Sequence, residues 1–422
     1  MKFKMQDRQN QLIERISPQH LIVGIDIAQQ THVARAVNFR GKILGNPLTF
    51  ENNEGGFSSL FQWIRKLQKE YQLTDVIIGM EPTGHYWINL STWLFEQEIE
   101  VVTVNPYHVK RNKENRDNTQ SKSDLKDALV IADMVKNGYY ASIQPTSEKF
   151  EKLRVLMANR DTIIKRLVST VNQINRWVDL VFPELREVFK NVTGKGAITT
   201  LRLFPTPQEI RALTPEDISS SWKKHMKRQP GLKKAAALFR VAQQSVGTES
   251  ALDAHRFHLQ QLLEEYDLTT TQLERVEETV RSVLDHIPYI ENLRSINGLN
   301  TISIAGILGE AGDLSQFSHG NALLRHAGLH LVEASSGKWR GQTVISKRGR
   351  SRLRRFLYMA TMNLINNNQE FKARHIYNVQ ERGMRRMKSL MKLIGKFARI
   401  LVGMTKNQEV YNPEKIHLLQ AA

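Results

Sequence analysis

The amino-acid sequence predicts a mixed α/β N-terminal domain, a long helical middle region and a mainly helical C-terminal domain. Short apolar runs alternate with amphipathic stretches in the first third. Apolar residues then recur at heptad spacing in two long stretches, and glycine-punctuated apolar helices follow. Strands that alternate with helices are typical of a sheet covered by helices, whereas sustained heptads are typical of long helices paired along a seam.

The N-terminal third contains the elements of the expected sheet. LIVGID at 21–26 is a buried-strand run that ends in an acid, and the next two runs form an antiparallel meander around the turn FRGK. The expected strands are 21–26, 31–38, 42–50, 75–80 and 99–104, and the expected helices are 56–70, 87–96 and 124–136.

The middle region carries two heptad patterns. In the first stretch the apolar positions are Leu153, Leu156, Ile163, Leu167, Ile174 and Trp177, and in the second they are Leu252, Leu259, Tyr266, Leu273 and Val280. We favour pairing of these helices between chains, and an antiparallel hairpin within one chain is the alternative. Between them lies a basic, proline-punctuated insert, 190–245, which contains WKKHMKRQPGLKK.

The last third is helical and basic. An apolar helix is expected at 301–309, entered through Gly298, and this pattern is similar to a helix-hairpin-helix, in which backbone N–H groups approach a phosphate. The stretch 338–355 has eight Lys or Arg and no acid. A second basic segment, 382–404, is amphipathic, so its apolar face can pack on the core while its cations face a phosphate backbone.

The charge balance indicates nucleic acid as the partner. Lys and Arg total 60 against 42 Asp and Glu, which gives a formal net charge of +18 over 422 residues. Nucleic-acid phosphates attract such a protein. The chain has no cysteine, which excludes disulfide scaffolds, zinc ribbons and thiol catalysis. Neither a signal-peptide core nor an apolar run of about 18 residues is present, so we expect no membrane partner.

Four carboxylates are candidates for chemistry. Asp26 ends the first strand and Glu81 follows another, while Asp124 and Asp127 lie three residues apart and share a helix face. If that helix packs beside the strand ends, the four acids converge. Clustered carboxylates suit Mg²⁺ or Mn²⁺, and such ions can activate a nucleophile in phosphoryl transfer. The structural alternatives are a turn cap for Asp26 and a helix N-cap for Asp124.

These motifs together resemble those of the DEDD-type transposases, the bacterial insertion-sequence recombinases related to the Piv/MooV invertases. The residues that carry the resemblance are GID, MEPTGHYW, the basic stretch after VNP, KSDLKDA, INGLNTISIAGILGEAGDLSQF, LLRHAGL and SSGKWRGQTVISKRGRSRLRR. The resemblance implies a RuvC-like domain of the RNase H fold at 1–140 and a C-terminal transposase domain at 288–410, and the heptads predict a coiled-coil region at 147–287 between them.

The resemblance also implies a serine nucleophile just before the glycine of the SSG motif. That residue is Ser336, with Ser335 as the alternative, although SSGK taken alone is an ordinary polar turn. Attack on a DNA phosphodiester gives a covalent protein–DNA link, assisted by the RuvC-like acids and Mg²⁺. The residues expected to hold nucleic acid are Lys110, Arg111, Lys338, Arg340, Lys347, Arg348, Arg350 and Arg352.

The expected function is therefore that of a DNA transposase or recombinase guided by a bridge RNA. It would act in the bacterial cytoplasm, at the nucleoid, on element ends and target DNA. It would form a homo-oligomer through the coiled coil, a dimer or a synaptic tetramer. The alternatives are a RuvC-like junction nuclease and a Piv-type invertase without a guide RNA. An ATPase of the actin type lacks its glycine-rich phosphate loops here, and the acids disfavour a non-catalytic scaffold.

Overall fold

A computed structural model shows the chain as two compact units, Met1–Pro145 and Thr146–Ala422, and each unit is described by itself. The described residues are 9–82, 84–112, 123–142, 147–228, 230–333, 335–336, 339–341 and 343–414, with the backbone alone at 335–336 and 339–340.

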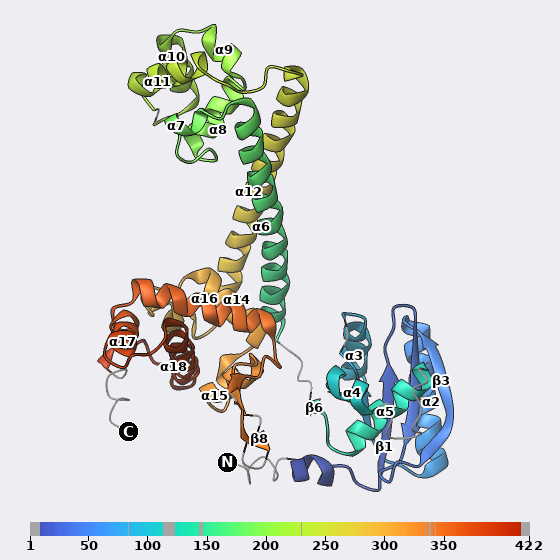
Figure 1. Cartoon of the computed structure of the whole chain (residues 1–422). Coiled ribbons are helices and arrows are strands. Elements are labelled where there is room, and N and C mark those ends of the chain that lie inside the picture. Colours follow the sequence, from blue (N-terminus) through green and yellow to red (C-terminus); the bar gives the residue numbers. More distant parts are fainter. Residues whose placement is uncertain are drawn as a thin grey trace. The chain divides into compact units, whose positions relative to one another are not determined.

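The first unit is built on a six-stranded mixed sheet (Figure 1). Its strands are β1 (His20–Asp26), β2 (Thr31–Val37), β3 (Ile43–Glu51), β4 (Asp75–Met80), β5 (Glu100–Thr103) and β6 (Ala141–Ser142). They are ordered β3-β2-β1-β4-β5-β6; β1, β4 and β5 are parallel, and the remaining pairs are antiparallel. This confirms the expected mixed α/β sheet, to which the structure adds the two-residue edge strand β6.

Helices cover both faces of this sheet. They are α2 (Glu54–Tyr71), α3 (Trp87–Glu96), α4 (Pro106–Asn112) and α5 (Asp124–Lys136). Side chains alternate across a strand. Leu21, Val23 and Ile25 of β1 therefore pack with α2 and α3, while Ile22 packs with α5. The two faces thus have separate cores, and the α5 face is the one that carries the acids described below.

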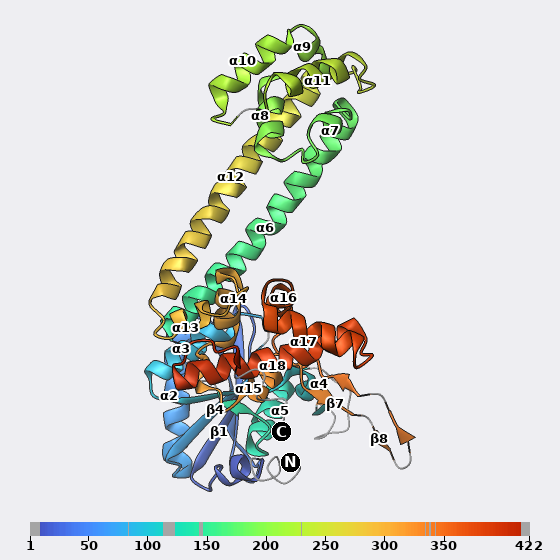
Figure 2. The same ribbon diagram turned by 90° about the vertical axis from the view of Figure 1, so that its left-hand side faces the viewer.

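Two long helices dominate the second unit, α6 (Glu148–Val181) and α12 (Leu252–Asp285), and they lie side by side in Figure 2. Arg160 pairs with Glu277 at 2.8 Å. Nearer the end of α6, the Trp177 indole donates to the carbonyl of His255 at 2.8 Å. Residues with higher numbers in α6 thus contact residues with lower numbers in α12, so the two helices are antiparallel. The structure shows the intrachain hairpin that was the alternative from the heptads, because the insert lets the chain turn back onto its own seam. Pairing between chains, which we favoured, stays a prediction.

The insert folds as a helical cap at the far end of this hairpin. Helix α7 (Leu185–Val188) leads into it, and its own helices are α8 (Lys195–Leu203), α9 (Pro207–Arg211), α10 (Pro215–His225) and α11 (Leu232–Gln243). Thr206 and Thr214 cap the helices that begin at the following prolines. The buried Trp222 donates to the Thr200 hydroxyl at 3.0 Å, so the insert has a packed core of its own, which includes the hairpin end.

The C-terminal region packs at the other end of the hairpin. Its helices are α13 (Ile290–Arg294), α14 (Thr301–Ala311), η1 (Leu314–Gln316), α15 (Gly320–His326), α16 (Ser351–Asn367), α17 (Gln369–Gln380) and α18 (Arg386–Asn407). Its strands are β7 (Leu331–Val332), β8 (Ser335–Ser336), β9 (Trp339–Arg340) and β10 (Val344–Ile345). The core joins Leu153 and Leu284 to α14, α16 and α18, so the segments 147–287 and 288–410 lie in one unit.

The turn before α14 has a packing role. Gly298 has a φ of 86°, and a Cβ there would lie 3.1 Å from the Cβ of Asn367. The side chain of Asn368 donates to the carbonyl of Asn297 at 2.9 Å. This turn therefore rests against the junction of α16 and α17. Over the described residues, none of the helices has the length and apolar character needed to cross a membrane.

Candidate functional site

Asp26 and Glu81 lie at the carboxyl ends of two neighbouring parallel strands. In the register of β1 and β4, Ile25 pairs with Met80, so the two acids that follow come level with each other. Asp26 shares a side of β1 with Gly24, which contacts α5. Gly79 of β4 also contacts α5, and because side chains alternate along a strand, Glu81 two residues later lies on the α5 face of the sheet as well. Both acids are partly buried.

Helix α5 brings the other two acids to the same edge. Ser123 is the N-cap, and its hydroxyl accepts from the Lys126 N–H at 3.2 Å. Asp124 is therefore not the cap; it lies in the first turn with Asp127, where the helix dipole favours carboxylates. Asp124 is exposed, whereas Asp127 is 6% exposed.

A glycine in β1 allows this close approach of α5. A Cβ on Gly24 would lie 2.0 Å from the carbonyl oxygen of Ala128, so only glycine fits below the helix. Ala128 follows Asp127 directly. The same contact thus fixes the N-terminal turn of α5 over the end of β1. The first turn of α5, with Asp124 and Asp127, thus packs over the sheet edge where Asp26 and Glu81 lie. Convergence of the four carboxylates on one centre stays a prediction.

The four carboxylates have the oxygen donors that Mg²⁺ and Mn²⁺ prefer. Among the described side chains, however, no three acids or histidines are close enough together to hold a metal ion. The donor chemistry and the shared sheet edge therefore fit a divalent ion, while the side chains themselves are not drawn together around one centre.

His32 is a residue that the sequence reasoning missed. It is fully buried on the opposite sheet face, and its Nδ1 accepts from the Ala28 N–H at 3.3 Å. Burial lowers its pKa, although a hydrogen bond with Asn52 acts in the other direction. The neutral ring therefore holds the turn that directly follows Asp26, which makes His32 a positioning residue. Its only signal in the sequence was a histidine in the alternating set of β2 positions that also contains Ala34 and Ala36.

Two of the expected nucleic-acid-binding residues lie near the acids. Lys110 and Arg111 are exposed on α4, which begins just beyond β5 and contacts α5. The Arg111 guanidinium lies 4.9 Å from the centre of the Tyr107 ring. Because β4 and β5 are parallel, α4 starts from the same edge of the sheet that carries Glu81. The first unit therefore has exposed cations beside its acids.

Ser335 and Ser336 form β8, a short strand in the second unit. The backbone pairs them with β9, Ser335 with Arg340 and Ser336 with Trp339. Strands β7 and β10 pair closer to the helices, Leu331 with Ile345. The side chains of Ser335, Ser336 and Arg340 lie outside the described residues, as does Lys338 altogether. The structure thus places both candidate serines in a paired two-residue strand and leaves the choice between them open.

The SKRG motif closes onto the RHAGL motif below this strand. The Lys347 N–H donates to the Gly328 carbonyl and the Arg350 N–H to the His326 carbonyl, both at 2.9 Å. Gly328 and Gly349 both have positive φ, and a Cβ on Gly349 would lie 2.4 Å from the Gly328 nitrogen. The two motifs thus form one packed base for the chain segment that carries the serines.

The four remaining expected phosphate-binding cations fall into two groups. Lys347 and Arg348 are exposed. Arg350 is also exposed, at 41% of its side chain, but lies 3.8 Å from Glu310, and Arg352 pairs with both Glu310 and Asp161. Glu310 is only 8% exposed at its side chain. Arg350 and Arg352 therefore have structural ion pairs that the sequence pattern did not reveal.

Two family models match the chain over these regions. The DEDD model of IS110 elements, described as a transposase, matches residues 23–183, and the transposase model of the IS116/IS110/IS902 family matches residues 290–376. The chain carries both domains of this transposase family. The first match includes all four acids and the second includes Ser335 and Ser336, whereas the insert lies outside both.

Several known proteins are similar to this chain in sequence. The pilin gene-inverting protein of Moraxella lacunata is 28% identical over 147 residues, which is 35% of this chain and 44% of that protein. The match thus spans less than half the length of that relative. An uncharacterised 44.8 kDa protein of insertion element IS116 from Streptomyces clavuligerus is 25% identical over 80% of this chain and 83% of its own. A putative transposase of the IS117 mini-circle from Streptomyces coelicolor is 23% identical over 75% of this chain and 77% of its own.

Proposed function

We propose that the protein is a DNA transposase or recombinase that cuts and rejoins strands through a serine-linked intermediate. The proposal is supported by Asp26 and Glu81 at the ends of two neighbouring parallel strands, and by Asp124 and Asp127 in the first turn of α5, which packs on β1. They lie within a domain that matches a DEDD transposase model. The sheet order, antiparallel on one side of β1 and parallel on the other, supports a RuvC-like domain of the RNase H fold.

The proposed step is a transfer of phosphorus from a deoxyribose oxygen to a serine oxygen. The hydroxyl oxygen of Ser336 attacks, its proton passes to a base, and the new serine–phosphorus bond forms as one ester bond to deoxyribose breaks. The released deoxyribose oxygen takes up a proton. Reversal onto another strand end rejoins the DNA. Exposed Lys347 and Arg348 would hold phosphates near the serine strand.

The four acids would hold Mg²⁺ or Mn²⁺ as their cofactor. When bound, the ion stabilises charge that develops on phosphate oxygens. The residues of the chain have the complementary tasks: Ser123 and Gly24 fix the turn of α5 that carries Asp124 and Asp127, and the two strands fix Asp26 and Glu81.

The decisive experiment is mass spectrometry of the protein after reaction with cognate element ends. We expect a nucleotide linked to Ser336. Ser336→Ala and Asp26→Ala should each abolish strand exchange and retain DNA binding. If Ser336→Ala retains strand exchange and Ser335→Ala loses it, the nucleophile is Ser335. Cleavage with no protein-linked nucleotide in any variant would favour the alternative of a metal-dependent junction nuclease.

The proposal includes a non-coding bridge RNA that pairs with donor and target DNA. Its support is the resemblance to RNA-guided insertion-sequence transposases. The Piv-type invertase without a guide is the alternative, and the match to a pilin gene-inverting protein favours it. Sequencing the RNA that co-purifies with the protein separates the two. An element-derived RNA required for strand exchange supports the guide, whereas full activity after ribonuclease treatment supports the invertase.

We also propose that the protein acts as a homo-oligomer, a dimer or a synaptic tetramer. The hairpin seam is covered within the chain, so contacts between copies would use its outer faces. Leu268 and Phe257 of α12 are 55% and 64% exposed there. Light scattering after size-exclusion chromatography should show more than one copy, and Leu268→Glu should reduce the mass. A monomer with full strand-exchange activity would contradict this proposal.

A further inference from the structure

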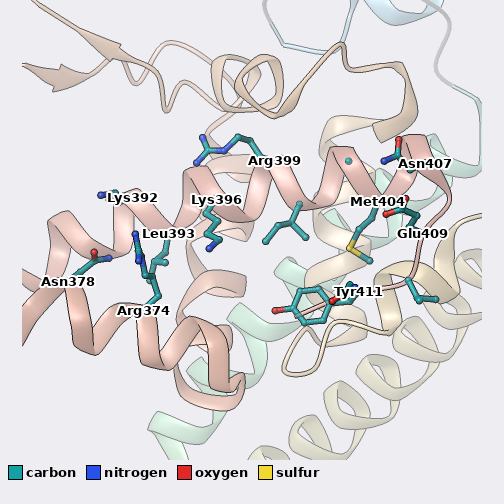
Figure 3. Close-up of a pocket in the computed structure, with 14 residues that line it drawn as sticks. Arg374, Asn378, Lys392, Leu393, Lys396, Arg399, Met404, Asn407, Glu409 and Tyr411 are labelled. Carbon is teal, nitrogen blue, oxygen red and sulfur yellow. The ribbon is translucent and has the colours of Figure 1, made fainter. Parts of the chain in front are cut away.

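A groove runs along α18 between α17 and the segment that follows α18 (Figure 3). Its volume is about 400 Å³, within the range of about 300–1,000 Å³ that is usual for small-molecule sites. It is formed by residues of one unit and lies apart from the acids and from the serine strand in the sequence. The groove includes the basic amphipathic segment, whose apolar residues Leu390, Ile394 and Phe397 pack into the core.

One half of the groove is cationic. Lys392, Lys396 and Arg399 share a face of α18, and Arg374 joins them from α17. Glu409 is the one acid among the described residues that line the groove, against these four cations. Burial and then the guanidinium of Arg374 and its cationic neighbours lower the pKa of Lys396. These cations repel one another, and a bound anion would relieve that repulsion.

The other half of the groove has apolar and aromatic side chains next to Glu409 and Asn407. Met404 and Val410 line it together with Tyr411, whose ring faces α18 in Figure 3. The Tyr411 N–H donates to the Ser295 hydroxyl at 2.8 Å, and its own hydroxyl lies 3.5 Å from Asn368 Oδ1. Both ends of the residue are therefore anchored. The groove therefore has a fixed aromatic side chain next to a cluster of cationic side chains that can bind a phosphate.

We propose that this groove binds one nucleotide of an unpaired nucleic-acid strand, with its phosphate at Arg374, Lys396 and Arg399 and its base against Tyr411. The proposal rests on the proposed function, because it assumes that the protein handles nucleic acid. A nucleotide has both the anion and the flat ring that the two halves require. Stacking of a base on an aromatic side chain does not depend on its sequence, so the groove holds a strand and does not read it.

The first test measures binding of fluorescent oligonucleotides at several salt concentrations. Single-stranded DNA, single-stranded RNA and duplex DNA form separate arms, which distinguish the source of the strand. For the Lys396→Gln/Arg399→Gln variant we expect at least tenfold weaker binding of one single-stranded probe. We also expect a salt slope lower by about 0.7 for each phosphate that the variant no longer neutralises. Lys372→Gln, an exposed position on α17 outside the groove, is the matched control and should bind as the wild type does.

The second test locates the base. A single-stranded probe with 5-iodouracil should cross-link to Tyr411 under near-ultraviolet light, and mass spectrometry should find the label on the peptide that contains this residue. Tyr411→Leu keeps apolar volume and removes the ring. We expect it to weaken single-strand binding by about 5- to 150-fold, the range for one stacked base.

Three outcomes would overturn the proposal. The first is that the groove variants bind the probes as tightly as the wild type does. The second is that cross-links form only outside the groove. The third is that the protein binds polyglutamate tightly but binds none of the oligonucleotide probes. Activity with element ends separates this inference from the proposed function. If the wild type exchanges strands and the groove variants bind all probes normally, the proposed recombinase function stands and the groove proposal is wrong. If the groove binds single strands and the protein exchanges no strands, the groove proposal stands and the proposed recombinase function is wrong.

Discussion

The guanidinium of Arg352 donates a hydrogen bond to the Asp161 carboxylate over 2.8 Å. This contact joins the first turn of α16 to α6, residues that lie 191 positions apart in the sequence. Arg352 also lies 3.3 Å from Glu310 of α14. A cation from the most basic stretch of the chain therefore links three helices, and its neighbour Arg355 reaches the same Asp161 at 2.6 Å.

Arg352→Gln should lower stability without weakening nucleic-acid binding. The substitution leaves Asp161 and Glu310 with fewer compensating charges in a partly buried place, which should cost about 1–3 kcal/mol of unfolding free energy. Urea denaturation measures this. Lys347→Gln is the matched comparison, because Lys347 is exposed and should affect binding and not stability. Weaker DNA binding by Arg352→Gln at wild-type stability would restore its expected role at phosphate.

Gly24→Ala should disrupt the edge that carries the acids. The added Cβ would meet the backbone of α5 at 2.0 Å and 2.4 Å, and overpacking against backbone should cost about 3 kcal/mol or more. Strand exchange should fall with stability. Gly55→Ala in α2 is the control, because the nearest atom to its Cβ is Asn53 Oδ1 at an ordinary 3.5 Å and alanine favours a helix by up to about 1 kcal/mol. Wild-type behaviour of Gly24→Ala would contradict the close packing of α5.

The hairpin register can be tested by charge reversal at Arg160 and Glu277. Each of Arg160→Glu and Glu277→Arg should destabilise the protein by placing like charges side by side where the native pair is 2.8 Å apart, and the double variant should recover most of the stability. Thermal unfolding measures the three proteins. A mixture of the two single variants distinguishes the pairing modes. Recovery in the mixture would indicate pairing between chains, whereas recovery in the double variant alone indicates the intrachain hairpin.

His326 should make the second unit sensitive to acid. Burial, followed by the charge of Arg350, lowers its pKa from 6.5 to about 4. Its neutral form is therefore favoured in the folded state. The associated stability is fully present above pH 6.5 and is lost as the pH falls toward 4. Between about pH 7 and pH 5 the melting temperature of the wild type should fall more than that of His326→Gln. His258→Gln, at an exposed position, should follow the wild type, and equal pH slopes in all three would contradict this role.

Local patterns were sufficient for most of the secondary structure. The run LIVGID alternates between two apolar faces, and β1 (His20–Asp26) has those faces against separate helices. The helix expected at 124–136 is α5, although its N-cap is Ser123 and not Asp124, the alternative that the sequence left open. The position of Asp26 and Glu81 at the ends of neighbouring strands also followed from the strand order. These features depend on neighbours in the sequence or on adjacent strands, and short-range periodicity encodes both.

Long-range charge pairing was not predictable in the same way. Eight cations in 338–355 look alike in the sequence, yet Arg352 faces Glu310 and Asp161 while Lys347 is exposed. The heptads likewise predicted two long helices and did not choose their partner. Only the folded insert, which reverses the chain, directs α12 back onto α6.

The sequence by itself determined the α/β class of the first unit, the two long helices, the charge and the set of candidate acids. The tertiary structure decided which cations are ion-paired, that the heptad seam is covered within the chain, and that α17, α18 and Tyr411 form one groove. The physical reason is distance along the chain. Amphipathic periodicity and capping act within a few residues, whereas the environment of a charge depends on burial and partners that distant segments bring to it.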